Sequence, residues 1–514
     1  MSQFRHALTV KRDDDFAAWY QEVISAADMA EESGVRGCMV IKPWGYGIWE
    51  RIQRLMDDRI KAAGVQNCYF PIFIPLRNFE REAEHVEGFA KEMAVVTHHR
   101  LIADGKGGLM PDPEAKLEEP LVVRPTSETI IGDAMARWVQ SWRDLPLLTN
   151  QWANVVRWEM RTRMFLRTTE FLWQEGQTAH ATREDALAET HRALEMYRAC
   201  AEEDLALPVI AGEKPENERF PGAVETWSIE AMMQDGKALQ AGTSHYLGTN
   251  FAHAAGIKYQ DREGSEQYCH TTSWGVSTRM IGGVIMTHGD DDGLRVPPRI
   301  APHQVVILPM LRETPEDEPL LAYCEELRAG LARQSAMGEP VRVLLDKSPG
   351  KAAAKRWDWV RKGAPVVIEV GPRDMAEGKV ALIRRDRLWN QETAKVAFQF
   401  VAREEATASI GALLGEIQQS LFDEAAARRD ANITRGVTSL AEVEAFYAGG
   451  AKFPGWLEVQ WSKPTGAALD QVVEVLKGMK LTIRNVPRES APADGACLFT
   501  GEPAVERILI ARAY

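Results

Sequence analysis

Arg157 and Glu159 form the pair of side chains with the clearest chemical use in this sequence. They lie two residues apart in Asn154–Met160, a stretch rich in β-branched and aromatic residues, so we expect a strand that presents both on one face. A second apolar run, Phe171–Glu175, predicts a partner strand and places Trp173 and Glu175 on one face. The loop between the two runs holds three more arginines: Arg161, Arg163 and Arg167.

This pattern predicts an antiparallel hairpin with an arginine-rich tip. Planar guanidinium groups bind phosphate oxygens in bidentate fashion, so such a tip suits a triphosphate. A surface salt bridge would show the same Arg-x-Glu spacing, and the spacing alone favours that interpretation. The apolar surroundings of Arg157 and the loop arginines favour the phosphate site instead.

The segment Arg124–Thr129 lies between a predicted strand (121–123) and a predicted helix (129–142). Thr126 or Ser127 would cap this helix through its hydroxyl group. Alternatively, the Thr126 hydroxyl and the Glu128 carboxylate would bind a small ammonium group. The segment alone favours capping, and both roles are compatible.

The segment Leu239–Gly248 contains small residues that permit the close approach of a ligand. Gln240, Thr243 and His245 supply neutral hydrogen-bond donors and acceptors there. The alternative is an ordinary turn between strands with a satisfied histidine, and we expect a turn in either case.

The segment Thr271–Gly283 is expected to pass from a strand into a helix. Arg279 would then lie in the first helical turn, where the positive end of the helix dipole attracts anions. A solvated arginine is the alternative. The following Thr287–Leu294 is acidic but lacks the spacing of an EF-hand, so we interpret it as a structural turn.

The composition narrows the class of protein. The chain has 514 residues and a net charge of −13, which disfavours indiscriminate nucleic-acid binding and a DNA partner. No apolar run approaches the ~20 residues that span a bilayer, so we expect no membrane association. The six cysteines form no CxxC pair, and no signal-peptide core follows Met1. We therefore expect a cytoplasmic protein.

A proline-rich segment, Leu294–Pro302, divides the chain, and we expect an extended linker there. Strands and helices alternate after it, which predicts a small α/β domain. Before it, apolar residues at helical spacing predict a helix over 48–60 that ends near Gly64. The run Tyr69–Pro75 contains two prolines and predicts an edge strand or an interface.

In this order, the arginine hairpin, the small polar segment and the arginine-led helix resemble motifs 2 and 3 of class II aminoacyl-tRNA synthetases. The helix ending near Gly64 and the run to Pro71 resemble motif 1, the dimer motif. Over nearly the whole chain, the sequence resembles prolyl-tRNA synthetases, closest to their archaeal/eukaryotic-like branch. Five strings carry the likeness: Arg124–Glu128, Val155–Glu159, Phe171–Gly176, Gln240–Gly248 and Met286–Pro298.

The resemblance implies a proline–tRNA ligase that uses ATP and Mg²⁺ and works as a homodimer on tRNA(Pro). In that family Thr126 and Glu128 would hold the imino group of proline. Arg157 would bridge the proline carboxylate and the α-phosphate of ATP. The proline pocket would be completed by four residues: Trp173, Glu175, His245 and Ser277.

The same resemblance implies an ATP site that shares Arg157. Glu159 would contact the adenylate, and Phe165 and Arg279 would enclose the adenine. Gln240 and Thr243 would contact ATP. Arg157 and Arg279 are the expected catalytic residues.

The resemblance also implies an α+β class II catalytic domain (1–295), a linker (296–302), an α/β anticodon-binding domain (303–405) and a small α+β C-terminal domain (406–514). Gly371–Asp374 match the anticodon-binding domain. Glu369, Arg373 and Asp374 are candidates for reading the anticodon.

The sequence departs from the family in three places. Gln177 replaces the usual histidine after Glu175-Gly176. From Gly411 onward only Cys497 could bind zinc, whereas a structural zinc site needs about four ligands, so we expect no zinc. No long insertion separates Glu175 from Gln240, so we expect no editing domain.

The chain ends in Ala511–Tyr514, and the resemblance implies that this terminus is buried and reaches towards the active site. Two alternatives to the proline enzyme stay open from sequence. One is a sister class II synthetase, such as that for threonine or histidine. The other is a non-catalytic tRNA-binding paralogue.

Overall fold

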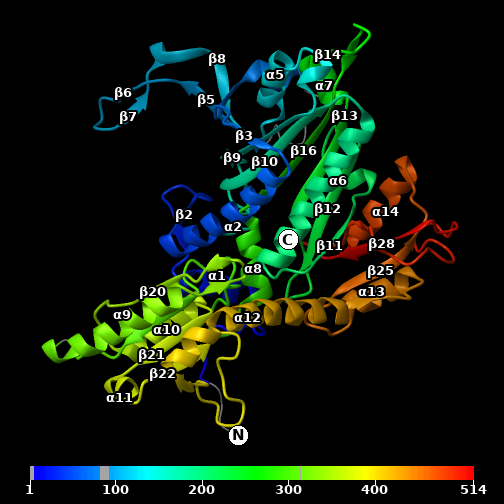
Figure 1. Cartoon of the computed structure of the whole chain (residues 1–514). Coiled ribbons are helices and arrows are strands. Elements are labelled where there is room, and N and C mark those ends of the chain that lie inside the picture. Colours follow the sequence, from blue (N-terminus) through cyan, green and yellow to red (C-terminus); the bar gives the residue numbers. More distant parts are fainter. Residues whose placement is uncertain (1–4, 82–91, 313) are drawn as a thin grey trace.

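An eight-stranded sheet organises the N-terminal half of the chain in the computed structural model, which describes residues 5–81, 92–312 and 314–514 (Figure 1). All neighbouring pairs are antiparallel except β3 with β9. The expected antiparallel sheet flanked by helices is therefore confirmed. In spatial order its strands are β27 (Val486–Pro487), β11 (Val209–Glu213), β12 (Glu225–Met232), β13 (Ala238–Gly248), β16 (His270–Ser277), β10 (Glu170–His180), β9 (Leu147–Val156) and β3 (Gln66–Asn67).

Helices cover this sheet and form the largest core of the molecule. Helix α6 (Arg183–Ala199) runs along β12, β13 and β16, as Figure 1 shows. Helix α2 (Pro43–Ala62) buries Ile48, Ile52 and Ile60 at helical spacing. The chain leaves α2 through Gly64, whose φ of +82° favours glycine, so the predicted helix end is confirmed. Helices α1 (Phe16–Ala26) and α8 (Arg279–His288) complete this core.

A smaller layer lies beside the eight-stranded sheet. Strand β4 (Phe73–Pro75) is at the edge of a three-stranded sheet with β8 (Lys116–Val123) and β5 (Ala94–His98), so the predicted edge strand is confirmed. A two-stranded arm projects from it. The other elements near this layer are β6 (Leu101–Ala103) and β7 (Leu109–Pro111) of the arm, α3 (Leu76–Arg81), α5 (Glu128–Trp138), α7 (Asn250–Ala255), β14 (Lys258–Gln260) and β15 (Glu266–Tyr268). A separate ribbon of β1 (Ala30–Glu32) and β2 (Met39–Ile41) contacts α1.

The predicted α/β unit follows residue 302 and has a five-stranded sheet. Its first three strands are parallel and the last two antiparallel. In spatial order they are β20 (Val343–Leu345), β17 (Val305–Pro309), β21 (Val366–Val370), β22 (Lys379–Arg384) and β23 (Gln399–Ala402), with a separate short ribbon of β18 (Ser335–Ala336) and β19 (Glu339–Pro340). Its helices are α9 (Glu318–Ala332), α10 (Ala352–Lys362) and α11 (Pro372–Ala376), and the long α12 (Arg403–Ala431) follows.

The C-terminal unit has a four-stranded sheet and its own core around Trp461 and Leu476. Its strand β27 extends the eight-stranded sheet beside β11, which joins the two units through backbone hydrogen bonds. The elements are β24 (Ile433–Thr434), α13 (Leu440–Ala448), β25 (Trp456–Trp461), α14 (Gly466–Gly478), β26 (Thr482–Ile483) and β28 (Glu506–Ala511).

The proline-rich segment Leu294–Pro302 is irregular, as expected, but it is not an extended linker. Residues 297–300 form a turn closed by a backbone hydrogen bond from Ile300 N–H to Pro297 O. Leu294, Val296 and Ile300 are buried in the core of the N-terminal unit. Burial of these apolar side chains ties the segment down, so it fixes the neighbouring units rather than separating them.

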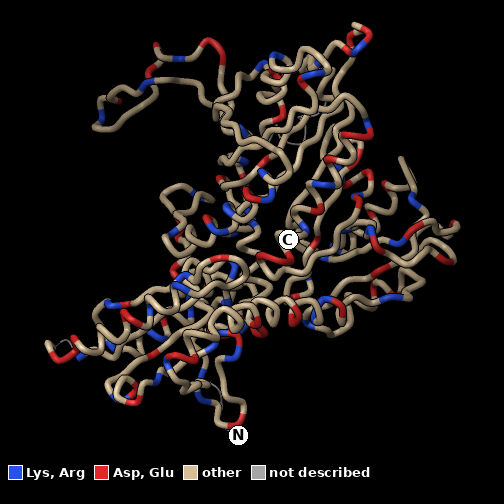
Figure 2. Tube along the Cα trace, viewed as in Figure 1, with Lys and Arg blue, Asp and Glu red and all other residues tan. Residues whose placement is uncertain are grey.

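The described helices are all too short or too polar to cross a membrane. Figure 2 shows acidic and basic residues interspersed along the whole trace. A cavity can therefore be lined mainly by basic residues even though the chain as a whole is negatively charged.

Candidate active site

The arginine hairpin positions the centre of the site. Strands β9 and β10 pair as predicted, with Val156 opposite Glu170. However, β9 ends at Val156, so the expectation that the strand continues to Met160 was wrong. Arg157 still donates its backbone N–H across the hairpin to Thr169 O, but Trp158 donates its N–H to Glu92 O instead, so the ladder ends there. The Arg157 side chain donates Nε to Pro125 O at 2.9 Å.

The Arg157 guanidinium lies against two aromatic rings. Its carbon atom is 5.6 Å from the centroids of both Phe171 and Trp173. Burial lowers the pKa of Arg157, whereas the charges of Glu128 and Glu175 raise it. The aromatic contacts and the bond to Pro125 therefore hold a cation in one orientation before any ligand binds.

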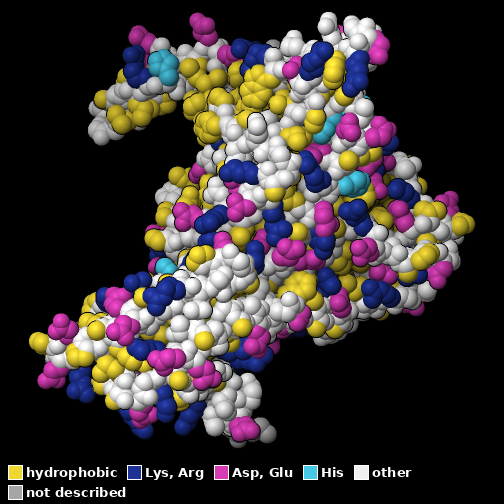
Figure 3. Space-filling view, viewed as in Figure 1, with side chains coloured by type: hydrophobic (Ala, Val, Ile, Leu, Met, Phe, Trp, Pro, Cys, Tyr) yellow, Lys and Arg dark blue, Asp and Glu magenta, His cyan; other side chains and the backbone are white. Residues whose placement is uncertain are grey.

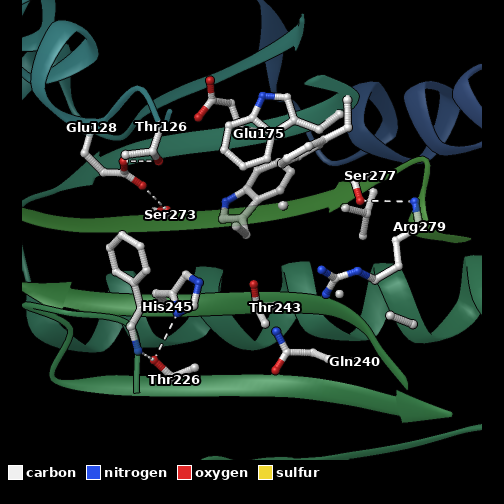
Figure 4. Close-up of a pocket in the computed structure, with 18 of the residues that line it drawn as sticks. Thr126, Glu128, Glu175, Thr226, Gln240, Thr243, His245, Ser273, Ser277 and Arg279 are labelled. Carbon is white, nitrogen blue, oxygen red and sulfur yellow. Dashed lines mark hydrogen bonds between the residues drawn. The ribbon is translucent and has the colours of Figure 1, made fainter. Parts of the chain in front are cut away.

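A cavity of about 230 Å³ opens beside this guanidinium and contains most of the predicted residues. In Figure 4, Thr126 and Glu128 lie at one end of it and Arg279 at the opposite end. The cavity thus has an acidic end and a cationic end. The predicted residues that line it are Thr126, Glu128, Arg157, Trp173, Glu175, Gln240, Thr243, His245, Ser277 and Arg279.

An adjoining cavity of about 270 Å³ contains the other two predicted residues, Glu159 and Phe165. Arg157, Ser277 and Arg279 line both cavities. The structure therefore brings all twelve predicted catalytic, proline and ATP residues into one continuous region.

The acidic end is a network of hydroxyl groups and two carboxylates. Glu128 accepts hydrogen bonds from Thr126 and, at 3.0 Å, from Ser273. Glu175 accepts from Ser127 and Gln151. Ser127 is the N-cap residue of α5 but makes no side-chain capping bond, so the capping interpretation of Thr126 and Ser127 was wrong. Their hydroxyl groups serve the carboxylates instead.

Burial and the neighbouring Glu128 charge raise the pKa of Glu175 to about 7, although the hydrogen bonds from Ser127 and Gln151 act in the opposite direction. Glu175 Oε2 and Trp173 Nε1 are buried without a hydrogen-bond partner among the described residues. A buried polar atom without a partner is costly, so these atoms suit a bound ligand.

Three further groups shape the cavity. Burial lowers the pKa of His245 to about 3, so its ring is neutral, and its Nδ1 lies 3.0 Å from the Thr226 hydroxyl. Phe220 packs on the same ring at 4.8 Å between centroids. Gly176 allows the Trp274 ring to cross β10, because an added Cβ would lie 2.2 Å from that ring.

The cationic end is fixed by the start of α8, as predicted. Arg279 donates Nε to Leu166 O at 3.1 Å, and its backbone N–H bonds Ser277 Oγ at 3.2 Å. Burial and the charges of Arg157 and Arg167 lower the pKa of Arg279 to about 10, so it remains charged at neutral pH. Gln240 and Thr243 lie on β13, a strand, so the expected turn at Leu239–Gly248 was wrong.

These features agree with the comparisons with known proteins. A family model described as tRNA synthetase class II core domain (G, H, P, S and T) matches residues 113–288, and one described as anticodon binding domain matches residues 304–403. The proline–tRNA ligase of Erythrobacter litoralis is 76% identical over 514 residues and covers 100% of both chains. The chain belongs to the proline–tRNA ligase family.

Other proline–tRNA ligases agree. The enzyme of Novosphingobium aromaticivorans is 72% identical over 510 residues and covers 99% of both chains. The crystal structure of prolyl-tRNA synthetase from Cryptosporidium parvum complexed with L-proline and AMP has a TM-score of 0.86 and 35% sequence identity. It covers 99% of this chain and 97% of that chain.

Sequence reasoning missed several residues that line this cavity, among them Glu218, Phe220, Thr226 and Ser273. Ser273 was detectable, because it lies at the two-residue spacing of Gly275 and Ser277 on β16 and so shares their face. Phe220 and Thr226 reach the cavity from a loop and from β12, and no sequence spacing links them to the other residues.

The anticodon candidates lie at the end of β21 and the start of α11. Glu369 is buried and pairs with Arg356 at 2.8 Å, and burial raises its pKa. Asp374 accepts the Gly371 N–H at 2.8 Å, whereas Arg373 is 90% exposed. Only Arg373 of these three therefore projects into solvent.

The C-terminal residues reach the cationic end, as expected, but the terminus is not fully buried: Ala511 is buried, whereas residues 512–514 are half-buried. The Tyr514 hydroxyl donates to Asp235 at 2.6 Å, and its backbone N–H donates to Ala238 O. Arg163 of the hairpin loop lies 5.5 Å from the Tyr514 ring centroid. The terminus is therefore fixed beside the arginine hairpin.

Proposed function

We propose that this chain is a proline–tRNA ligase that activates proline with ATP and transfers the prolyl group to the 3′ end of tRNA(Pro). The observation that carries the proposal is one cavity with carboxylates at one end, cations at the other and the pre-oriented Arg157 between them. Proline–tRNA ligases of 68–76% identity over 99–100% of this chain support the same activity.

Proline binds with its ammonium group at the acidic end. Glu128 and Glu175 supply the negative charge, and Thr126 orients Glu128 through its hydroxyl group. Trp173, the neutral His245 and Ser277 line the space for the ring. The proline carboxylate then faces Arg157.

Activation joins the proline carboxylate to the α-phosphorus of ATP, and pyrophosphate leaves. This carboxylate is ionised at neutral pH, so the step needs no general base. Arg157 and Arg279 stabilise the charge on the transferring group, which makes positioning and electrostatics the source of the rate. In the second step, a terminal ribose hydroxyl of the tRNA attacks the prolyl carbonyl and AMP leaves.

ATP lies along the cationic end. Arg279 and Phe165 enclose the adenine, and Gln240, Thr243 and Glu159 contact the nucleotide. The L-proline and AMP complex of the C. parvum enzyme and its complex with AMPPNP support ATP as the substrate.

Mg²⁺ accompanies ATP. Glu92 and Glu159 line the cavity that holds Arg157 and Arg279, and their carboxylate oxygens are the hard donors that Mg²⁺ prefers, so the site fits this ion. When bound, the ion would neutralise phosphate charge. Glu159 is already oriented, since it accepts the Arg161 N–H at 2.8 Å.

The C-terminal unit holds together without zinc in this proposal. No group of three or more potential metal ligands occurs among the described residues. Cys497 is buried, yet hydrogen bonds from Ser462 and Thr500 outweigh burial and lower its pKa. The Ser462 and Thr500 hydroxyl groups also bond each other at 2.9 Å. This cluster and the core around Trp461 stabilise the unit.

We also propose the division into domains at 1–295, 296–302, 303–405 and 406–514. The separate cores of the three units support the three globular parts, whereas Val296, Ile300 and Ala301 of the 296–302 segment pack in the first of these cores. The helix α12 is shared, because Ala406, Ile410 and Leu414 pack in the core of the anticodon unit. Glu369, Arg373 and Asp374 remain our candidates for the anticodon.

A homodimer is part of the proposal. The projecting arm exposes apolar side chains that gather in the upper left of Figure 3. A two-stranded ribbon is marginally stable alone in water, so contact with a second copy would stabilise it. The exposed apolar residues are Leu101, Ile102, Leu109 and Met110, at 58%, 38%, 71% and 40% exposure. Light scattering that reports a monomer at micromolar concentration would contradict this.

We place the protein in the cytoplasm and in the branch without an editing insertion. Its six cysteines are all free, which suits a reducing compartment. Between Glu175 and Gln240 the chain forms only the end of β10, α6, two short helical turns, β11 and β12. The likeness to the C. parvum enzyme over nearly the whole of both chains supports this branch.

ATP–pyrophosphate exchange and tRNA charging test the proposed function. Exchange should depend on proline, with alanine and cysteine much weaker and threonine inactive, and the protein should charge tRNA(Pro). Folded protein that binds ATP but exchanges nothing with proline would contradict the proposal.

A further inference from the structure

A second cavity, of about 980 Å³, lies beside the active site. The arginine hairpin, the C-terminal unit and the last two residues of the chain form its walls. Leu166, Arg167 and Arg279 line both this cavity and the ATP side of the active site. The second cavity is therefore continuous with the place where the adenylate forms.

The lining is strongly cationic although the chain has a net charge of −13. Nine basic side chains face one acidic side chain, Glu218. Some are paired with acids outside the cavity: Arg484 with Glu230 at 2.8 Å, and Lys237 with Asp235 at 2.9 Å. The Lys477 Nζ lies 3.2 Å from Glu474 in an exposed pair on the same helix, which contributes little, and Arg167 lies 3.6 Å from Glu159. Within the described part of the chain, no acidic side chain pairs with four others: Arg36, Arg161, Arg163 and Lys480.

The C-terminal unit supplies two of these cations at a fixed turn. Lys477 is in the last turn of α14, and Lys480 follows with a φ of +58°. Two backbone bonds close the turn, Lys480 N–H to Lys477 O at 3.0 Å and Leu481 N–H to Leu476 O at 2.9 Å. The turn therefore holds both lysines at the cavity, across from the hairpin arginines.

An aromatic ring lies close to two cations in the same cavity. The Tyr514 ring has Arg163 at 5.5 Å and the Lys237 Nζ at 4.8 Å from its centroid. A groove that combines basic side chains with an aromatic ring is typical of sites for single-stranded nucleic acid. A polyphosphate alone would need the cations but not the ring.

We propose that this cavity admits the single-stranded 3′ end of the tRNA, and that Lys477 and Lys480 bind its phosphate groups. The inference rests on the proposed function, since the terminal ribose must reach the adenylate beside Arg279. Each nucleotide carries one negative phosphate group. The hairpin arginines would bind these phosphates on one wall of the cavity, and the C-terminal lysines would bind them on the other. The C-terminal unit thereby contributes to substrate binding as well as to stability.

The test compares two tRNA(Pro) transcripts, one intact and one that lacks the single-stranded 3′ end, against the variant Lys477→Ala/Lys480→Ala. Arg435→Ala/Lys452→Ala is the control, because it removes two exposed cations of the same unit outside this cavity. The readouts are the Kd of each transcript, the kcat/KM of charging, its salt dependence, and proline-dependent exchange.

For the intact transcript, we expect the lysine variant to lose affinity and charging efficiency by about tenfold at low salt. The slope of log kcat/KM against log salt should become shallower by about 0.7 for each lost contact with a single strand. The truncated transcript should bind both proteins equally. Exchange should stay at the wild-type rate, and the control variant should match the wild type.

Three results would overturn the inference. Equal losses for both transcripts would place the lysines on another part of the tRNA. A parallel loss of exchange would assign the cavity to ATP or pyrophosphate. Unchanged charging and salt slope would leave the lysines without a role in binding tRNA. A wild-type protein that exchanges nothing with proline would instead contradict the proposed function.

Discussion

Glu175 and Glu230 are buried carboxylates in the same sheet, and their surroundings are opposite. Glu175 is 3% exposed, faces Glu128 and receives hydrogen bonds from two neutral groups, so its pKa rises to about 7. Glu230 is 0% exposed and lies 2.8 Å from both Lys214 Nζ and Arg484 Nη2. These two charges outweigh burial and lower its pKa.

The difference shows which of the two carboxylates has its charge and hydrogen-bonding capacity satisfied by the protein itself. One cation, Lys214, follows β11, and the other, Arg484, belongs to the C-terminal unit. Glu230 therefore links the C-terminal unit to the eight-stranded sheet. Glu175 has no cation in direct contact among the described residues, and one of its oxygens has no hydrogen-bond partner there. A bound ammonium group would supply what the fold leaves out.

Arg157→Ala should give the largest effect, because in the proposed mechanism it removes the cation that bridges the two substrates. We expect proline-dependent exchange to fall by about 10³-fold or more, with the melting temperature almost unchanged. Exchange kinetics and thermal unfolding measure the two. If the variant exchanges at the wild-type rate, the catalytic centre lies elsewhere. If the wild-type protein binds tRNA but shows no exchange, it is a non-catalytic paralogue.

Glu230→Gln should affect stability instead. It leaves Lys214 and Arg484 buried without their anion, which we expect to cost about 3–5 kcal/mol of unfolding free energy. Surviving folded protein should keep its exchange rate. Glu195→Gln, which breaks an exposed pair with Arg198, is the control and should cost less than about 1 kcal/mol. Equal melting temperatures for both variants would contradict the account of Glu230.

Glu175→Gln should increase stability, whereas Glu230→Gln should decrease it. When folding raises the pKa of a carboxyl group, the folded protein loses stability as the pH rises from the pKa of the unfolded state to that of the folded state. The glutamine variant avoids this cost, so it should gain up to about 3 kcal/mol at pH 8. Its KM for proline should rise by about tenfold through loss of the charge. A less stable variant with unchanged KM would remove the contrast with Glu230.

Ser127→Ala should give the smallest effect and sharpens the same contrast. Its hydroxyl group lowers the pKa of Glu175, so removing it should raise that pKa further, by about one unit. The midpoint of any pH profile governed by Glu175 should move to higher pH. A shift to lower pH would mean that this hydroxyl does not stabilise the carboxylate.

Much of the fold followed from the sequence where periodicity was strong. The α2 helix, the hairpin and the alternating anticodon unit were all predictable from apolar spacing and breaker residues. The segment Leu294–Pro302 was not, because proline content shows only that a helix is excluded. Its burial depends on the helices of the catalytic core that cover it.

The membership of the site was more predictable than its local geometry. All twelve predicted catalytic and substrate-binding residues meet in adjoining cavities. However, the hydroxyl groups of Thr126 and Ser127 turn to carboxylates instead of capping α5. Thr126 bonds the nearby Glu128, whereas Ser127 bonds Glu175, which comes from a distant strand that the local sequence does not reveal. Likewise, Gln240–Gly248 forms a strand because β12 and β16 flank it.

The pH profile of kcat/KM for proline in pyrophosphate exchange tests the central claim, that an ionised Glu175 completes the proline site. The wild type should gain about tenfold between pH 6 and pH 8, with a midpoint near the pKa of about 7. Glu175→Gln should show a flat profile over this range. A flat wild-type profile, or the same rise in the variant, would contradict the claim.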